Sequence, residues 1–161
     1  TLAITLFRSF RYIIQPSSTQ DYGEQKGSQC LGRQEARFAF YPFDVRDVSA
    51  LYEKALTFNT SLRIVQHGNA AGRVKQGESF FELSNNAVII SCIKEPQDRE
   101  KNAVILRIYN PTEKTQNTEI KSIFTLKDAF ETTLKEIVIN KTDLKNINLT
   151  PKKIKTFKLC L

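Results

Sequence analysis

The sequence predicts an antiparallel β-sandwich with one capping helix, formed by a single domain over residues 1–161. Two apolar runs, residues 86–93 and 103–109, are rich in Val and Ile, which suit the pleated surface of a strand. The charged stretch between them, residues 95–102, is too short for a helical crossover, so the two runs are predicted to pair as an antiparallel hairpin. Both runs are apolar on both faces, so we expect this hairpin to form the middle of the sandwich.

The apolar runs outside the hairpin are predicted to be strands, because each is of strand length and is bounded by polar or Gly-rich segments. The polar segment 16–33 contains three glycines and has neither helical nor strand periodicity, so it is predicted to be a long loop. The additional strands are expected at residues 2–10, 35–43, 62–65, 120–126, 134–139 and 152–161.

One helix is predicted between residues 44 and 59. Asp44 or Asp47 can accept hydrogen bonds from the free N–H groups at its start, and the helix should end near Asn59. We expect its apolar stripe to cover the sheet. The stripe has helical spacing and consists of Val48, Leu51, Tyr52, Ala55 and Leu56.

The net charge of +7 does not by itself indicate a nucleic-acid partner. No helix-turn-helix, zinc finger or RNA-binding motif accompanies it, so nucleic-acid binding is not predicted. The densest group of lysines lies in residues 152–158, where it alternates with Ile154 and Phe157. This pattern predicts the solvent face of a strand near a sheet edge, where lysines discourage aggregation.

The cellular context is inferred from the chain start and the cysteines. The apolar runs are far shorter than the roughly 20 residues that a membrane span needs, so no membrane partner is predicted. The chain begins directly in a strand pattern without Met or a signal sequence, and we expect it to be a fragment of a longer protein. Cys30, Cys92 and Cys160 are odd in number and widely spaced, which predicts free, buried thiols in a reducing compartment.

Catalytic motifs are sparse in the sequence. His67 is the only histidine and has no Asp, Glu or Cys at metal-ligand spacing. Glycosidases need two carboxylates across the sugar, and Asp21 and Glu24 in the long loop are the only suggestive pair. Carboxylates beside glycines in loops are usually solvated. The residues alone therefore favour an accessory or structural module over an enzyme.

Four segments, which together span the chain, resemble the carboxy-terminal β domain of glycoside hydrolase family 38, the zinc-dependent α-mannosidases. The specific segment is 79–110, whose matching residues include Lys94, Arg107, Tyr109 and Asn110. Phe43 and Lys153 replace the family's His and Glu at their positions, so no role of those side chains carries over. The other three segments are 5–9 (TLFRS), 29–42 (QCLG with FAFYP) and 151–159 (PKKIKTFKL).

The resemblance implies a sandwich of the galactose-mutarotase-like, or supersandwich, type at the end of a cytoplasmic, bacterial α-mannosidase. The implied partner is the catalytic β/α domain of that enzyme, which would bind zinc, perform retaining hydrolysis and take the α-mannoside substrate. No catalytic or metal residue and no cofactor are expected in this chain. Arg8, Asp21 and Glu24 are the candidate contacts with the catalytic domain or the sugar-site entrance, although Arg8 is also consistent with a structural arginine.

A second hypothesis is a stand-alone carbohydrate-binding or structural β-sandwich module. Such a module presents exposed aromatic rings for sugar stacking, and Tyr12, Tyr22 and Tyr41 are the candidates. The oligomeric state and the mannoside linkage are left open by the sequence.

Overall fold

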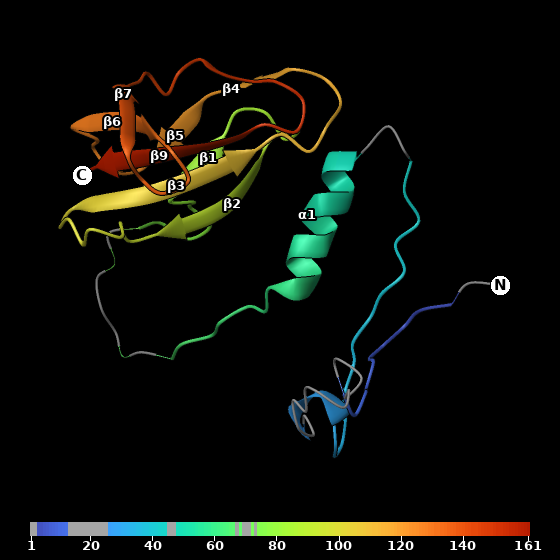
Figure 1. Cartoon of the computed structure of the whole chain (residues 1–161). Helices are drawn as coiled ribbons and strands as arrows, with labels where there is room; N and C mark the ends of the chain where they lie inside the picture. Colours follow the sequence, from blue (N-terminus) through green and yellow to red (C-terminus); the bar gives the residue numbers. More distant parts are fainter. Residues whose placement is uncertain (1–2, 13–25, 45–47, 67, 69–71, 73) are drawn as a thin grey trace, which may run out of the picture. The chain divides into compact units, whose positions relative to one another are not determined.

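The computed structural model describes residues 3–12, 26–44, 48–66, 68, 72 and 74–161 (Figure 1). Its contacts divide the chain into two compact units, Thr1–Phe40 and Tyr41–Leu161. A single domain over residues 1–161 stays a prediction. No helix in the described part of the chain has the length and apolarity that are needed to cross a bilayer.

The second unit is built around a five-stranded antiparallel sheet in the order β2-β3-β9-β6-β7. Its strands are β2 (Ile89–Lys94), β3 (Ala103–Tyr109), β6 (Asp128–Thr132), β7 (Val138–Lys141) and β9 (Ile154–Cys160). Two short antiparallel pairs accompany this sheet: β1 (Phe81–Leu83) with β5 (Ile120–Ser122), and β4 (Gln116–Thr118) with β8 (Ile147–Leu149).

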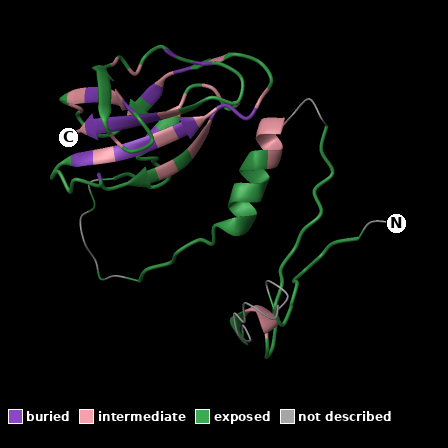
Figure 2. Ribbon diagram, in the orientation of Figure 1, coloured by how far each residue is buried: buried purple, intermediate pink, exposed green. Residues whose placement is uncertain are grey.

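The hydrophobic core joins one face of the large sheet to the two short pairs. Leu106 of β3 lies opposite Phe157 of β9, and both are fully buried. Burial of one such side chain contributes about 1.5–3 kcal/mol. Figure 2 shows the buried residues concentrated along β3 and β9. The predicted antiparallel β-sandwich is therefore confirmed. The remaining core residues are Phe81, Val88, Ile108, Ile120, Ala129, Ile147, Leu149 and Leu159.

The predicted hairpin forms, but it does not occupy the middle of the sheet. β2 and β3 pair antiparallel around the loop 95–102, and β3 is largely buried as expected. β2, however, is an edge strand without a buried residue. The centre of the sheet is β9, which pairs with β3 on one side and with β6 on the other. The prediction that the lysine-rich run lies near an edge was therefore wrong.

Several predicted strands do not form because they have no strand beside them. Residues 3–10, 35–43 and 62–65 are extended and exposed, without ladder pairing among the described residues. An apolar run provides a side-chain pattern, but a strand also requires a neighbour for its backbone hydrogen bonds. Of the predicted strand 134–139, only Val138 and Ile139 belong to a strand, β7, and the residues before them form a loop. Only Ile120–Ser122 of the predicted strand 120–126 is a strand.

The predicted helix is α1 (Val48–Asn59), in the second unit. Its last turn is closed by the backbone N–H of Thr60, which donates to the carbonyl of Leu56 at 2.8 Å. The ring of Tyr52 meets the ring of Tyr109 edge to face, with 5.7 Å between centroids. The predicted capping helix is confirmed at the β2 edge, where Glu53 and Leu56 line a hollow with Ile89 and Ile90, although none of the described α1 residues is buried.

The first unit is described from residues 3–12 and 26–40, and none of these residues is buried. Its one helical element is a short 3-10 turn, Lys26–Gln29. Phe10 and Ser28 exchange two hydrogen bonds, one from the backbone N–H of Phe10 (3.1 Å) and one from the hydroxyl of Ser28 (2.8 Å). These bonds join the two described stretches of the unit.

Candidate functional site

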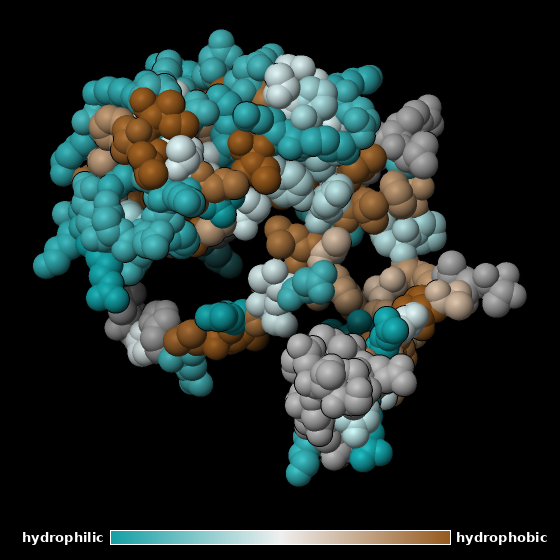
Figure 3. All heavy atoms as spheres, viewed as in Figure 1, coloured by the Kyte–Doolittle hydropathy of each residue, from teal (hydrophilic) through white to brown (hydrophobic). Residues whose placement is uncertain are grey.

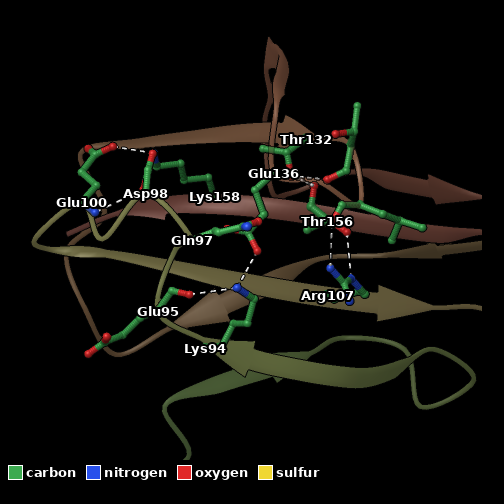
Figure 4. Close-up of polar contacts among 12 residues, drawn as sticks. Lys94, Glu95, Gln97, Asp98, Glu100, Arg107, Thr132, Glu136, Thr156 and Lys158 are labelled. Atoms are coloured by element: carbon green, nitrogen blue, oxygen red, sulfur yellow. Dashed lines mark hydrogen bonds and ion pairs between the residues drawn. The ribbon is translucent and has the colours of Figure 1, made fainter.

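A polar network covers the face of the five-stranded sheet that points away from the core. Side chains alternate between the faces of a strand, so Arg107 lies opposite to its core-facing neighbours Leu106 and Ile108. Thr156 and Lys158 of β9 lie on this same outer face, since they pair with Arg107 and Ile105. Figure 4 shows Lys158 directed toward Asp98 and Glu100, and Arg107 and Thr156 directed toward each other.

Glu136, in the loop 133–137, is bound by two donors. Its carboxylate lies 2.5 Å from Nζ of Lys94 on β2, and it accepts a 2.6 Å hydrogen bond from the backbone N–H of Gln97. The side chain of Glu136 is only 10% exposed. The hydrogen bond from Lys94, followed by that from Gln97, holds the pKa of Glu136 below its usual value. This carboxylate therefore stays ionised and functions as an anchor.

Lys158 makes a second anchor at the centre of the sheet. Its Nζ lies 2.8 Å from Asp98 and 2.5 Å from Glu100, both in the loop 95–102. The hydrogen bonds to Asp98 and then to Glu100 raise the pKa of Lys158, and the bond with Lys158 lowers the pKa of Asp98. A lysine can lie in the middle of a sheet here because two carboxylates pair with its charge.

Arg107 connects the outer face to the loop 133–137. Its Nε donates to Oγ1 of Thr156 at 3.0 Å, and one terminal nitrogen donates to the backbone carbonyl of Leu134 at 3.5 Å. Asn110, at the end of β3, is fully buried and donates through its side-chain amide to the carbonyls of Lys114, Leu149 and Thr150. Arg107 and Asn110 therefore both have structural partners.

The network is not arranged for acid–base or nucleophilic chemistry. Each of its carboxylates, Asp98, Glu100 and Glu136, is paired with a lysine. A general base must instead have a lone pair available to the substrate proton. Burial raises the pKa of the Cys160 thiol, which keeps it protonated and a weak nucleophile. The arrangement holds two loops on a sheet.

Two hollows flank α1, and neither has a pair of free carboxylates. One, of about 390 Å³, lies between α1 and β2 and has Glu53 as its only carboxylate. The other, of about 410 Å³, contains Glu113, which is already paired with Lys152 at 2.8 Å. Glycoside hydrolysis needs two carboxylates across one sugar. The described lining of both hollows therefore lacks that constellation.

The residues predicted for the contact site are only partly described. Arg8 is exposed in the first unit, and its backbone carbonyl accepts a 3.7 Å hydrogen bond from the Cys30 thiol. Asp21 and Glu24 lie outside the described residues, as do His67 and Tyr22.

The resemblance implies that zinc binds in the catalytic domain and not in this chain, and this stays a prediction. Within the described residues, no three His, Cys, Asp or Glu side chains are grouped to hold a metal ion. The three cysteines are free and half-buried, each on a different segment, whereas the sequence predicted buried thiols.

The polar network could not be predicted from the sequence, although its members are ordinary charged residues. Lys158 lies 60 positions from its partner Asp98, and Gln97 lies 39 positions from Glu136. No local spacing connects such residues. The only signal is the charge content of the stretch 95–102, which does not identify the partners of those charges.

Comparison with known families gives one match. Residues 87–157 match the family described as the glycosyl hydrolases family 38 C-terminal beta sandwich domain. The matched segment begins just before β2 and ends at Phe157 within β9. It therefore includes the polar network except Lys158. No curated protein and no solved structure matches the chain.

Proposed function

We propose that the chain is the accessory end of a zinc-dependent, retaining α-mannosidase, because residues 87–157 match the C-terminal beta sandwich domain of glycosyl hydrolase family 38. The domain implies a catalytic domain in the same enzyme, and we infer that this is a β/α domain that binds the zinc and the α-mannoside. The single observation that carries the proposal is the family match over the five-stranded sheet.

The role of the sandwich in this proposal is to pack on the catalytic domain and to shape the entrance to its sugar site. Two observations favour an accessory role for the sandwich. The carboxylates of the polar network are paired with lysines, and no three His, Cys, Asp or Glu side chains of the described residues are grouped to hold a metal ion. Arg8, Asp21 and Glu24 remain the proposed contacts near the sugar site.

A bacterial, cytoplasmic location completes the proposal. The cysteines support the cytoplasmic part of this proposal, because Cys30, Cys92 and Cys160 are all unpaired in the structure. Disulfides persist in oxidising compartments and are rare in the cytosol.

The experiment compares two proteins on an aryl α-mannoside in the presence of zinc. The full-length enzyme should turn the substrate over and hold zinc after dialysis, as measured with a colorimetric metal indicator. Residues 1–161 alone should do neither. Turnover or stoichiometric zinc in residues 1–161 alone would place the catalytic residues in this chain and overturn the proposal. An inactive full-length enzyme would overturn the assignment to α-mannosidases.

A stand-alone carbohydrate-binding module is the second candidate, because aromatic rings are exposed on the sandwich. Phe80 stacks on Phe124 with 5.7 Å between centroids and 13° between planes, and more than half of Phe80 is exposed. Outside the strands of the sandwich, Tyr12 of the first unit and Tyr41 are also exposed. Calorimetric titration with mannosides separates the candidates: saturable binding by residues 1–161 favours the module, and no binding favours the accessory role.

A further inference from the structure

One edge of the five-stranded sheet carries a compact apolar surface. The β7 surface consists of four apolar side chains within six consecutive residues: Leu134 (61% exposed), Ile137 (63%), Val138 (49%) and Ile139 (59%). In the view of Figure 1, Figure 3 shows apolar atoms gathered where β6 and β7 are drawn. Every residue of β7 is exposed, so both faces of this strand meet solvent within the described chain.

The β7 surface is held in a fixed conformation. The turn before it is closed by the N–H of Thr133, which donates to the carbonyl of Ile137 at 2.9 Å, and by the N–H of Ile137, which donates to the Thr133 hydroxyl at 3.2 Å. Glu136, inside the same turn, is bound by Lys94 and Gln97. A fixed apolar surface loses little conformational entropy when it is covered, which favours binding.

The two edges of the sheet differ in their protection. β2 at one edge has α1 beside it, since Leu56 and Glu53 of the helix line a common hollow with Ile89 and Ile90. β7 at the other edge has no described neighbour besides β6. The lysine within the strand, Lys141, is paired with Asp128, which reduces its repelling effect at this edge. Exposed apolar edge strands are aggregation sites unless something covers them.

We propose that the β7 surface is the contact through which this domain packs on the catalytic domain of its own enzyme. This inference rests on the proposed function, which supplies a catalytic domain in the same polypeptide. A domain tethered by a linker is present at an effective concentration of the order of millimolar. Two linked domains can therefore stay bound through a small interface that would be too weak to hold two separate molecules together.

The size of the surface argues against a second copy as its occupant. A stable interface between free proteins buries about 800 Å² per partner and uses about 20–30 residues on each side. The β7 surface offers four apolar side chains. Lys135, between Leu134 and Glu136, is exposed and makes no ion pair within the described chain. The facing surface should accordingly be apolar and carry a carboxylate at its rim.

The test is photo-crosslinking in the full-length enzyme, with p-benzoylphenylalanine in place of Ile139. The matched control places the same residue at Ile93, which is 53% exposed on the opposite edge strand β2. Irradiation of the Ile139 variant should join β7 to a peptide of the catalytic domain in the same molecule, as identified by mass spectrometry, and the Ile93 variant should not. A crosslink between two copies, a catalytic-domain crosslink from position 93 instead, or no crosslink would each overturn the inference.

A substitution provides a second readout in the same enzyme. Ile139→Asp should accelerate limited proteolysis between the two domains at least several-fold, because a carboxylate in an apolar contact must remain solvated. Ile93→Asp should leave the cleavage rate unchanged. The proposed function fails separately, in the mannoside assay: an enzyme inactive on mannosides that still crosslinks through position 139 keeps the contact and loses the activity assignment. An active enzyme without the crosslink keeps the activity and loses the contact.

Discussion

The backbone N–H of Gln97 donates to the carboxylate of Glu136 over 2.6 Å, and this bond joins the loops of two hairpins. Gln97 lies between β2 and β3, and Glu136 lies between β6 and β7, with β9 between the two hairpins in the sheet. Lys94 contributes a second bond to the same carboxylate. The outer face is therefore tied together by side chains in addition to the backbone ladder, and these ties can be removed one at a time.

Glu136→Gln should lower the free energy of unfolding at neutral pH but not in strong acid. The folded-state pKa of Glu136 is lower than its unfolded value of about 4.3, because Lys94 and Gln97 donate to the carboxylate. Its stabilisation is thus complete above that value and is lost as the pH falls through the lower, folded pKa. The variant should be less stable than the parent chain at pH 7, and the difference should vanish in strong acid. Urea unfolding at a series of pH values measures this.

The control for that experiment is Glu113→Gln, since Glu113 also faces a lysine but is 82% exposed. Exposed ion pairs contribute little to stability. Equal pH profiles for both variants would mean that the Glu136 anchor has no special role.

Lys158→Met should remove a contribution of Lys158 to the free energy of unfolding that depends on pH in the alkaline range. Asp98 and Glu100 raise the pKa of Lys158, so its stabilisation is present below the unfolded value of about 10.4 and is lost as the pH rises through the higher, folded pKa. The methionine keeps the buried stem and removes the charge. Hydrogen exchange at neutral pH should become faster in the loop 95–102. Lys121→Met, at an exposed lysine, should leave that loop unchanged.

Asn110→Ala should destabilise the sandwich by about 1–3 kcal/mol, because it leaves buried carbonyls without a donor. The Asn110 amide donates to Leu149 and Thr150 at 3.1 Å each and so holds the turn before β9. Asn110→Asp should cost more, since it sets a carboxylate against carbonyl oxygens. Asn86→Ala, at an exposed position, is the control for urea unfolding. Equal effects at positions 86 and 110 would contradict the assigned role.

Phe157→Ala should cost about 3–5 kcal/mol, the usual loss for a fully buried phenylalanine. Phe157 is 0% exposed in the central strand. Because small domains are stable by only about 5–15 kcal/mol, the variant should unfold at a much lower temperature or not fold at all. Ile154→Ala in the same strand, at a half-exposed site, should shift the unfolding free energy by less than about 0.5 kcal/mol. Thermal and urea unfolding followed by circular dichroism compare the two.

The sequence was sufficient for elements whose signal is local. The β2–β3 hairpin, the helix over residues 48–59 and a strand near residues 154–160 all follow from patterns within a few residues. Strand order could not be obtained in this way. The lysines of β9 indicated an edge, because the carboxylates that neutralise them are distant in sequence.

Other elements have no recognisable alternation of apolar and polar residues, or have an alternation that does not correspond to a strand. β1, β4, β5 and β8 have three residues each, which is too short to display alternation. Residues 35–43 display alternation but lie without a partner strand in the described chain. Of the predicted contact residues, only Arg8 falls in the described part, and its side chain is exposed there.

The central place of β9 determines the order in which the sheet can assemble. The hairpins β2–β3 and β6–β7 contain only local pairings, so each can form early. They cannot join each other, because β9 is inserted between them and is made after both. Until residues 154–160 pair with them, β3 and β6 are edge strands with unpaired backbone N–H and C=O groups. The two half-sheets formed without β9 therefore expose strand edges that favour association with other chains, and pairing with β9 covers those edges.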